Sequence, residues 1–181
     1  PEWVYQLSTP TQAGTHIQGP HYFLEHGARI DSFPLDRFEG WAHIVETDRR
    51  GVDTEVADLE HQLEGRDLRG QIVLLRTGHM DELMAGTPLR DSQRPGLSLD
   101  AAQWLIDRGI GMVAIDSIGV ESRKSENFEV NVLLCHQGIL ILEGLVSLDA
   151  ISSNPVWLEA FPLKVAGVEG TPCRAIAKVP A

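Results

Sequence analysis

Basic clusters, cysteines and long apolar runs are all scarce in this chain of 181 residues. No run of basic residues is longer than the pair Arg49 and Arg50, and 26 acidic side chains outnumber 15 basic ones. The resulting net charge of -11 repels polyanions. We therefore expect neither a nucleic acid nor an anionic membrane surface as a partner.

Its two cysteines, Cys135 and Cys173, stand apart without the Cys-x-x-Cys spacing of metal and redox sites. Isolated thiols are typical of a reducing compartment, so we expect a cytoplasmic protein. The apolar run that ends at Leu142 is broken by Glu143 and is far too short to span a bilayer. No signal-like segment opens the chain, but the first residue is Pro rather than Met, which leaves a missing N-terminal segment open.

The remaining composition is that of an ordinary globular protein, with 43% apolar and 23% charged residues. A chain of this length can bury a large core without disulfides or a structural metal. Because no repeat or low-complexity linker divides the sequence, we expect a single domain over residues 1–181.

Hydrophobic periodicity predicts strands that alternate with helices, and hence an α/β fold. Residues 41–46 alternate as a strand does, while residues 71–75, 112–115 and 139–142 are short apolar runs typical of buried strands. Residues 71–75 and 112–115 flank the clearest helix, so the order strand, helix, strand predicts a βαβ-like unit.

That helix is expected over residues 99–108, with Ser98 as its N-cap and Gly109 in the left-handed conformation at its exit. A second helix is expected over residues 54–63, with Thr54 as its N-cap. Residues 163–166 and 173–178 read as a closing pair of strands.

Two long connections are expected, over residues 9–34 and 78–97. A connection as long as the second is more often functional than idle. The first contains Thr-Gln-Ala-Gly-Thr-His-Ile-Gln-Gly-Pro-His-Tyr-Phe at residues 11–23. If that segment is extended, Gln12, His16 and Gln18 lie on one face, because side chains alternate along a strand.

Residues 12–22 resemble the hallmark of the cyclase family, the kynurenine formamidase-like metal-dependent hydrolases. The hallmark is His-x-Gly-Thr-His-x-Asp-x-Pro-x-His, and Gly14, Thr15, His16 and Pro20 match it. Gln12, Gln18 and Tyr22 stand where the hallmark has His, Asp and His. Further blocks are similar to family segments, namely residues 33–40, 72–78, 95–98, 111–117 and 131–149.

The resemblance implies a swivelling β/β/α-type fold, in which a central mixed β layer carries flanking helices, and assembly as a dimer or tetramer. It also implies a small-molecule substrate with an amide, lactone or related carbonyl group. By position, Gln12, His16 and Gln18 would be the metal site for zinc or manganese, and Tyr22 and Asn131 would contact the substrate. Glu143, or His21, which lies one position before the missing last His of the hallmark, would move protons.

Only His16 and Glu143 survive of the six polar groups that the resemblance implies. Amide oxygens are neutral and are weaker ligands for zinc or manganese than imidazole or carboxylate. Two alternatives therefore stay open. One is a metal-assisted hydrolase, and the other is a metal-free pocket in which His16 or His21 is the base and the Gln amides stabilise an oxyanion.

Structural roles compete with each of these assignments. Gln12 and Gln18 could order a turn, His16 could be a buried histidine bonded to backbone, and Glu143 could be a solvated strand end. A non-catalytic ligand-binding protein or a degenerate subunit is thus the alternative to an enzyme. The adjacent Cys135 and His136 do not predict a catalytic thiol, since neighbouring residues on a strand point apart.

Overall fold

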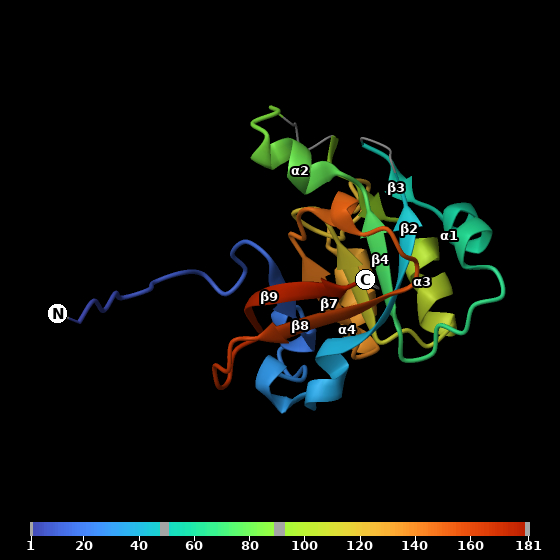
Figure 1. Cartoon of the computed structure of the whole chain (residues 1–181). Helices are drawn as coiled ribbons and strands as arrows, with labels where there is room; N and C mark the ends of the chain where they lie inside the picture. The colour runs from blue at the N-terminus through green and yellow to red at the C-terminus, as the bar shows by residue number, and fades with distance from the viewer. Residues whose placement is uncertain (1, 48–50, 89–92, 180–181) are drawn as a thin grey trace.

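The computed structural model describes residues 2–47, 51–88 and 93–179 (Figure 1). Seven strands close into a mixed barrel in the order β1-β7-β6-β4-β2-β8-β9. They are β1 (His16–Gln18), β2 (Glu39–Glu46), β4 (Ile72–Arg76), β6 (Met112–Ile115), β7 (Leu140–Glu143), β8 (Val156–Pro162) and β9 (Gly170–Lys178). The expected central mixed β layer is therefore confirmed, and it is rolled into a barrel.

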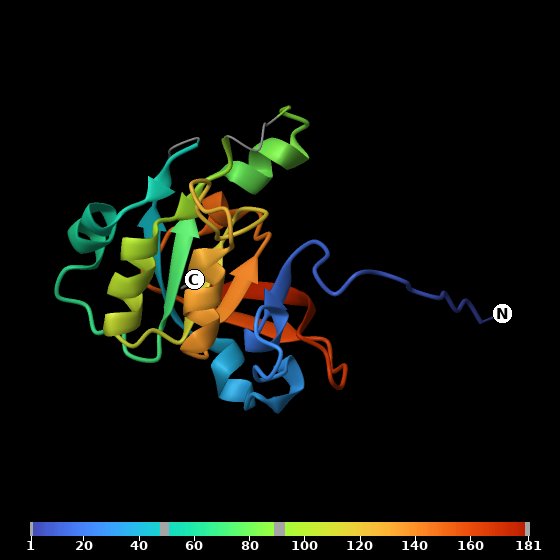
Figure 2. The same ribbon diagram turned by 180° about the vertical axis from the view of Figure 1, so that it is seen from behind.

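Strands β2, β4, β6 and β7 run parallel to one another, whereas β1, β8 and β9 pair antiparallel with their neighbours. Four α-helices lie in the described residues: α1 (Val56–Leu63), α2 (His79–Met84), α3 (Leu99–Asp107) and α4 (Glu129–His136). Figure 2 shows α3 and α4, in yellow-green and orange, lying across one face of the parallel strands. Strands β3 (Asp53–Thr54) and β5 (Gly96–Leu97) form a separate two-stranded ladder.

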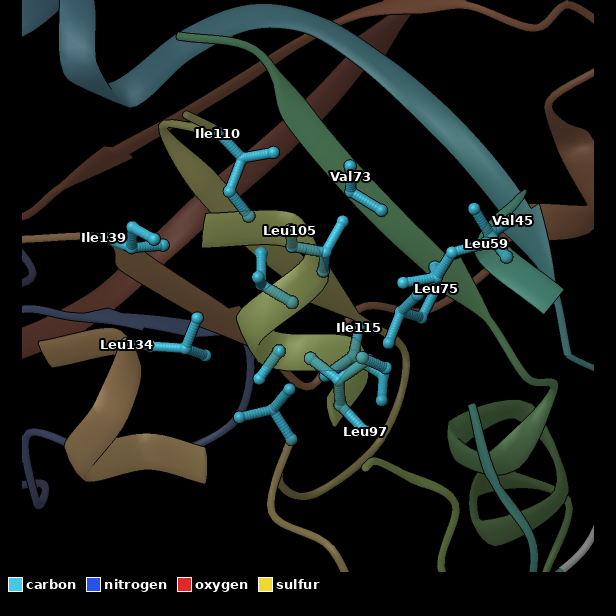
Figure 3. Close-up of a cluster of buried hydrophobic side chains, with 14 of the residues drawn as sticks. Val45, Leu59, Val73, Leu75, Leu97, Leu105, Ile110, Ile115, Leu134 and Ile139 are labelled. Carbon is cyan, nitrogen blue, oxygen red and sulfur yellow. The ribbon is translucent and has the colours of Figure 1, made fainter. Parts of the chain in front are cut away.

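Each parallel strand is buried on both faces, which explains its continuous apolar sequence. In β4, Val73 and Leu75 pack outward with Leu105 of α3 and Leu134 of α4 (Figure 3). The alternate residues of the parallel strands and of β8 form a second apolar cluster with Ile17 of β1. The barrel thus separates two cores, one beneath the helices and one inside it.

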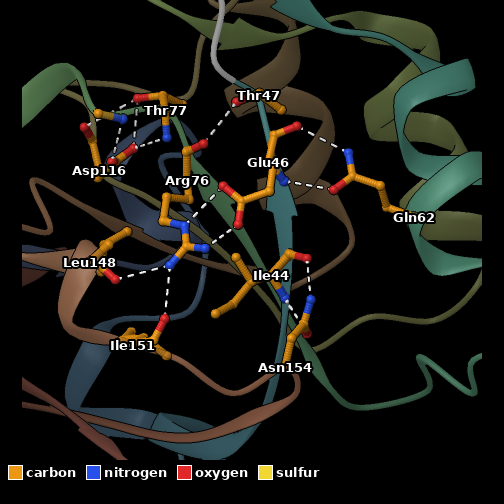
Figure 4. Close-up of polar contacts among 11 residues, drawn as sticks. Ile44, Glu46, Thr47, Gln62, Arg76, Thr77, Asp116, Leu148, Ile151 and Asn154 are labelled. Carbon is orange, nitrogen blue, oxygen red and sulfur yellow. Dashed lines mark hydrogen bonds and ion pairs between the residues drawn. The ribbon is translucent and has the colours of Figure 1, made fainter.

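Arg76, at the end of β4, ties the strand ends to the segment that precedes β8 (Figure 4). Its Nε donates to a carboxylate oxygen of Glu46 at 2.9 Å, and its Nη1 donates to the main-chain oxygens of Leu148 and Ile151 at 3.0 and 3.1 Å. One guanidinium therefore satisfies backbone groups that no strand pairs, and it fixes this rim of the barrel.

The βαβ-like unit is confirmed, since β4 and β6 pair in parallel with α3 between them in the chain. Ser98 caps α3 by accepting a hydrogen bond from the main-chain N–H of Ala101 at 3.2 Å, and Gly109 follows with a φ of +69°. Helix α1 begins later than predicted. Thr54 lies in β3, and Glu55 is the N-cap because it forms a capping box with Asp58.

Two other expectations were wrong. The strand that pairs with β9 is β8, not residues 163–166, because Val156, Leu158 and Ala160 are the alternate residues that enter the core. Residues 78–97, expected as one long connection, contain α2 and β5. Acidic residues in the first turn of α2 favour a helix there, but this helix is too short for hydrophobic periodicity to reveal it.

Replacing Ser98 with Ala removes the N-cap of α3 and should lower the free energy of unfolding by about 1 kcal/mol. Urea denaturation would measure the loss. Ser152→Ala is the matched control, because Ser152 is exposed in a loop and caps no helix. Equal losses in the two variants would contradict the capping role.

Candidate active site

The pairing of β1 with β7 brings His16 and Glu143 face to face. The two strands are antiparallel, and His16 is the residue directly opposite Glu143 in the ladder. Directly opposed residues project from the same face of a sheet. The Nε2 of His16 lies 3.3 Å from a carboxylate oxygen of Glu143, and the two residues are only 5% and 6% exposed. The predicted convergence of these two residues, remote in sequence, is confirmed.

Both ring nitrogens of His16 face hydrogen-bond acceptors. Nδ1 lies 2.8 Å from the main-chain oxygen of Gly14, and Nε2 faces Glu143. A neutral imidazole can donate from only one nitrogen, whereas an imidazolium donates from both. Burial alone would lower the pKa of His16, but the hydrogen bonds to Glu143 and Gly14 outweigh burial and leave that pKa raised. The geometry therefore favours an imidazolium-carboxylate pair.

Glu143 is anchored on its other side. Its Oε1 accepts a hydrogen bond from the main-chain N–H of Val120 at 2.8 Å. Val120 belongs to the segment that leaves β6 (Met112–Ile115), so the carboxylate bridges β1, β7 and this segment. The His16 ring and the Val120 N–H give this buried carboxylate hydrogen-bond partners on both oxygens. These partners offset the cost of burying a charge at the end of an apolar strand.

Gln12 lines the same cavity as this pair, although the condition of an extended segment is met only in part. Gly14 has a φ of +62°, which turns the chain, and only residues 16–18 form a strand. The Nε2 of Gln12 donates to Glu169 Oε1 at 3.1 Å, and Thr11 donates to the same oxygen. Burial would raise the pKa of Glu169, but these hydrogen bonds outweigh burial and the pKa is lowered. An ionised Glu169 thus fixes Gln12.

Gln18 begins a chain of side-chain hydrogen bonds that reaches α4. Its Nε2 donates to Asn131 Oδ1 at 3.1 Å, and Asn131 Nδ2 donates to Glu121 Oε2 at 2.7 Å. Glu121 also accepts from the main-chain N–H groups of Val130 and Asn131 in the first turn of α4. The Oε1 of Gln18 is buried without a partner in the described part of the chain. This orphaned acceptor is an available site for a ligand N–H.

These side chains line a cavity of about 140 Å³. Four larger surface hollows lie elsewhere, two of about 480 Å³ and the others of about 330 and 250 Å³, but none of them is lined by His16 or Glu143. One wall of the smaller cavity is aromatic. The rings of Tyr22 and Phe23 lie 4.6 Å apart between centroids, and those of Phe23 and Phe128 lie 5.4 Å apart. The complete lining is Gln12, His16, Gln18, Tyr22, Phe23, Arg94, Ile118, Gly119, Glu121, Phe128, Asn131 and Glu143.

The structure brings six of the seven predicted site residues to one cavity: Gln12, His16, Gln18, Tyr22, Asn131 and Glu143. The seventh, His21, is not part of the lining described above. The 3-10 helix of Pro20–Tyr22 turns successive side chains in different directions, so Tyr22 reaches the cavity while His21 lies near Glu169. We therefore do not assign His21 the proton transfer that its position in the sequence suggested.

Sequence reasoning missed Arg94, Glu121 and Phe128. Arg94 lies in the segment 78–97, whose length alone pointed to a functional loop. Glu121 and Phe128 lie in the connection from β6 to α4, where no periodic pattern marks a site. Only the folded chain shows that this connection closes over β1.

Known proteins resemble this chain over most of its length. Residues 1–122 match the sequence profile of the Cyclase family. Cyclase-like protein 3 of Oryza sativa subsp. japonica is 30% identical over 177 residues, which are 94% of this chain and 64% of that protein. The kynurenine formamidase of Paracidovorax citrulli is 29% identical over 179 residues, covering 98% of this chain and 81% of that protein. The chain thus spans less than two thirds of the rice relative.

Solved structures share the fold. A structure described as a potential metal-dependent hydrolase with cyclase activity superposes with a TM-score of 0.83 at 26% identity, over 97% of this chain and 83% of that one. An isatin hydrolase bound to the product analogue thioisatinate gives a TM-score of 0.87 over 96% of this chain and 74% of that one. At 21% identity, the second likeness supports the fold alone.

A divalent metal is implied by the resemblance, but the donor set does not fit one. Nδ1 of His16 faces the main-chain oxygen of Gly14 and Nε2 faces Glu143, and the imidazolium that this arrangement favours has no lone pair for a metal. Gln12 and Gln18 supply neutral amides in place of an imidazole and a carboxylate. Across residues 2–47, 51–88 and 93–179, no three His, Cys, Asp or Glu side chains are grouped to hold an ion.

No helix in these described ranges is long and apolar enough to cross a membrane.

The raised pKa of His16 makes the stability of the protein depend on pH. The stability that His16 adds is fully present below its ordinary pKa of 6.5 and is lost as the pH rises through the raised value. The difference in free energy of unfolding between the wild type and His16→Gln should therefore shrink from about pH 6 to about pH 9. Urea denaturation across this range measures it.

His136→Gln is the control for that series, because it removes an exposed imidazole from α4. A difference for His16→Gln that grows with pH would contradict the ion pair.

Proposed function

The chain belongs to the cyclase family, and on that premise we propose that it hydrolyses an amide or related carbonyl compound with His16 and Glu143 in place of a metal. The single observation that supports this most is the buried pair at 3.3 Å inside an aromatic-walled cavity. A relative named kynurenine formamidase supports an amide as the substrate group. We also propose that the barrel is of the swivelling β/β/α type and that the protein is a dimer or tetramer.

Glu143 is the general base of the proposed reaction. Its carboxylate accepts a proton from a water molecule while the water oxygen attacks the substrate carbonyl carbon. His16, as the imidazolium, then donates its Nε2 proton to the leaving nitrogen, so the C–N bond breaks and a neutral amine departs. The protonated Glu143 returns a proton to His16 across their 3.3 Å contact, which restores both groups. The balance is one water added across one amide bond.

Charge on the carbonyl oxygen requires a donor in the transition state. The Nε2 of Gln12 uses one hydrogen on Glu169, and the amide carries a second. Its anchoring by Glu169 keeps that N–H oriented before the reaction begins, which is the property that makes an oxyanion donor effective. Gln18 is anchored in the same way through Asn131.

A non-catalytic binding protein or degenerate subunit is the second candidate, and the substitutions Gln12 and Gln18 favour it. Both remove groups that the family hallmark supplies, and both leave a polar, aromatic-walled cavity suited to a small ligand. The two candidates share the cavity and differ only in turnover.

Replacing Glu143 with Gln should abolish base catalysis while preserving shape. We expect kcat/KM for formanilide to fall by roughly 10²- to 10⁴-fold, the usual contribution of a positioned general base. Release of aniline provides the assay. The control Glu126→Gln neutralises an exposed carboxylate outside the cavity lining and should leave the rate unchanged. Wild-type protein that turns over no formanilide, lactone or cyclic imide would favour the binding protein.

Chelation separates the metal-free reaction from a metal-dependent one. Protein dialysed against EDTA should keep its rate, and elemental analysis before dialysis should find zinc and manganese only in substoichiometric amounts. One bound metal per chain together with a rate that chelation removes and metal restores would contradict the proposed mechanism.

A further inference from the structure

We propose that Arg94 forms a carboxylate-binding subsite in this cavity, so that its ligand is a small aromatic acid. Where the proposed function holds, the substrate is accordingly an aromatic amide that bears a carboxylate. This substrate assignment rests on that function, whereas the binding subsite does not.

Arg94 faces the His16 and Glu143 pair across Gly119. A methyl group at Gly119 would lie 3.0 Å from Arg94 Nη1 and 3.9 Å from Glu143 Oε1. The guanidinium and the proposed base therefore approach the same point on the cavity wall. A ligand group held by Arg94 would be a close neighbour of the reacting bond.

Arg94 is the cation in the cavity that no acidic side chain neutralises, among the residues that the structure describes. Its one hydrogen bond to the described part of the chain is a long one of 3.5 Å from Nη2 to the main-chain oxygen of Glu121. The carboxylate of Glu121 is committed to Asn131 and to the first turn of α4, and that of Glu143 to His16 and Val120. A planar guanidinium with free donors matches a carboxylate in a bidentate arrangement.

A second feature of the cavity points independently to a ligand. Gln18 is only 2% exposed, it lines the cavity, and its Oε1 has no partner within the described residues. Leaving such an acceptor unpaired is costly, and a ligand N–H would satisfy it. An anilide or aminobenzoate offers both the N–H for Gln18 and the carboxylate for Arg94.

The cavity sets the size of the ligand. A cavity of roughly 150 Å³ in another protein holds one benzene ring. The present volume of about 140 Å³ and the wall formed by Tyr22, Phe23 and Phe128 therefore suit a single aromatic ring. Together these features select a ring that carries nitrogen on one side and a carboxylate on another.

Calorimetric titration with benzoate and with benzamide tests the subsite without any turnover. The two probes share the ring and differ in charge. We expect benzoate to bind the wild type at least roughly tenfold more tightly, and Arg94→Met to abolish that preference. Arg94→Lys should retain part of it, since charge remains without the planar fork. Arg69→Met is the control, because it removes an exposed guanidinium that does not line the cavity.

Gly119→Ala provides a second variant if Arg94→Met does not fold. The added methyl group would stand 3.0 Å from Arg94 Nη1 and displace the guanidinium, so it too should weaken benzoate binding. Equal affinity of the wild type for benzoate and benzamide, or no binding of either, would overturn the subsite.

Hydrolysis of 2-, 3- and 4-formamidobenzoate, compared with formanilide, tests the substrate assignment. At least one of the three acids should have a lower KM than formanilide in the wild type, and Arg94→Met should remove that difference in KM. A fall in kcat for all four compounds with unchanged KM would overturn the assignment and place Arg94 at the oxyanion. If none of the four is hydrolysed but benzoate is preferred, the proposed function fails while the subsite stands.

Discussion

The register between β1 and β7 is the constraint on which the site depends. It places His16 directly opposite Glu143, on one face, at hydrogen-bonding distance. A slip of one residue would turn Ile17 toward the cavity and His16 toward the core, because side chains alternate along a strand. Since Ile17 is fully buried, the hydrophobic core fixes the register that the chemistry requires.

Close backbone contacts hold β1 in that register. An added Cβ at Gly144 would lie 2.6 Å from the main-chain oxygen of Gly14, and one at Gly170 would lie 2.5 Å from that of Ile17. Larger residues at either position would push β1 away from β7 or β9. The short strand that carries His16 is thus held on both edges, and its imidazole is set before any ligand arrives.

The sequence predicts the parts of the fold that local physics decides. Ser98, Gly109 and the apolar run at residues 112–115 each carry a capping, turn or burial signal, and the corresponding helix and strand were found. The pairing of β8 with β9 could not be read, because strand pairing between distant segments depends on which apolar face meets the core. Six of the seven predicted site residues lie in the cavity, and family resemblance rather than periodicity predicted them. Arg94 and Glu121 could not be placed there, since the loops that carry them show no pattern.

Gln12 and Gln18 stand where the family hallmark has His and Asp, so an ion pair instead of a metal holds the charge at the centre of the proposed site. An imidazolium-carboxylate pair carries no net charge, so it leaves Arg94 as the cation that attracts a ligand. The protonation state of His16 therefore decides whether an ion pair holds this charge. Nitrogen-detected NMR of the wild type and Glu143→Gln tests it directly. We expect the His16 ring to carry protons on both nitrogens and to titrate above 6.5, with a lower midpoint in the variant. A ring that is neutral at and above pH 6.5 in the wild type would contradict the imidazolium-carboxylate pair.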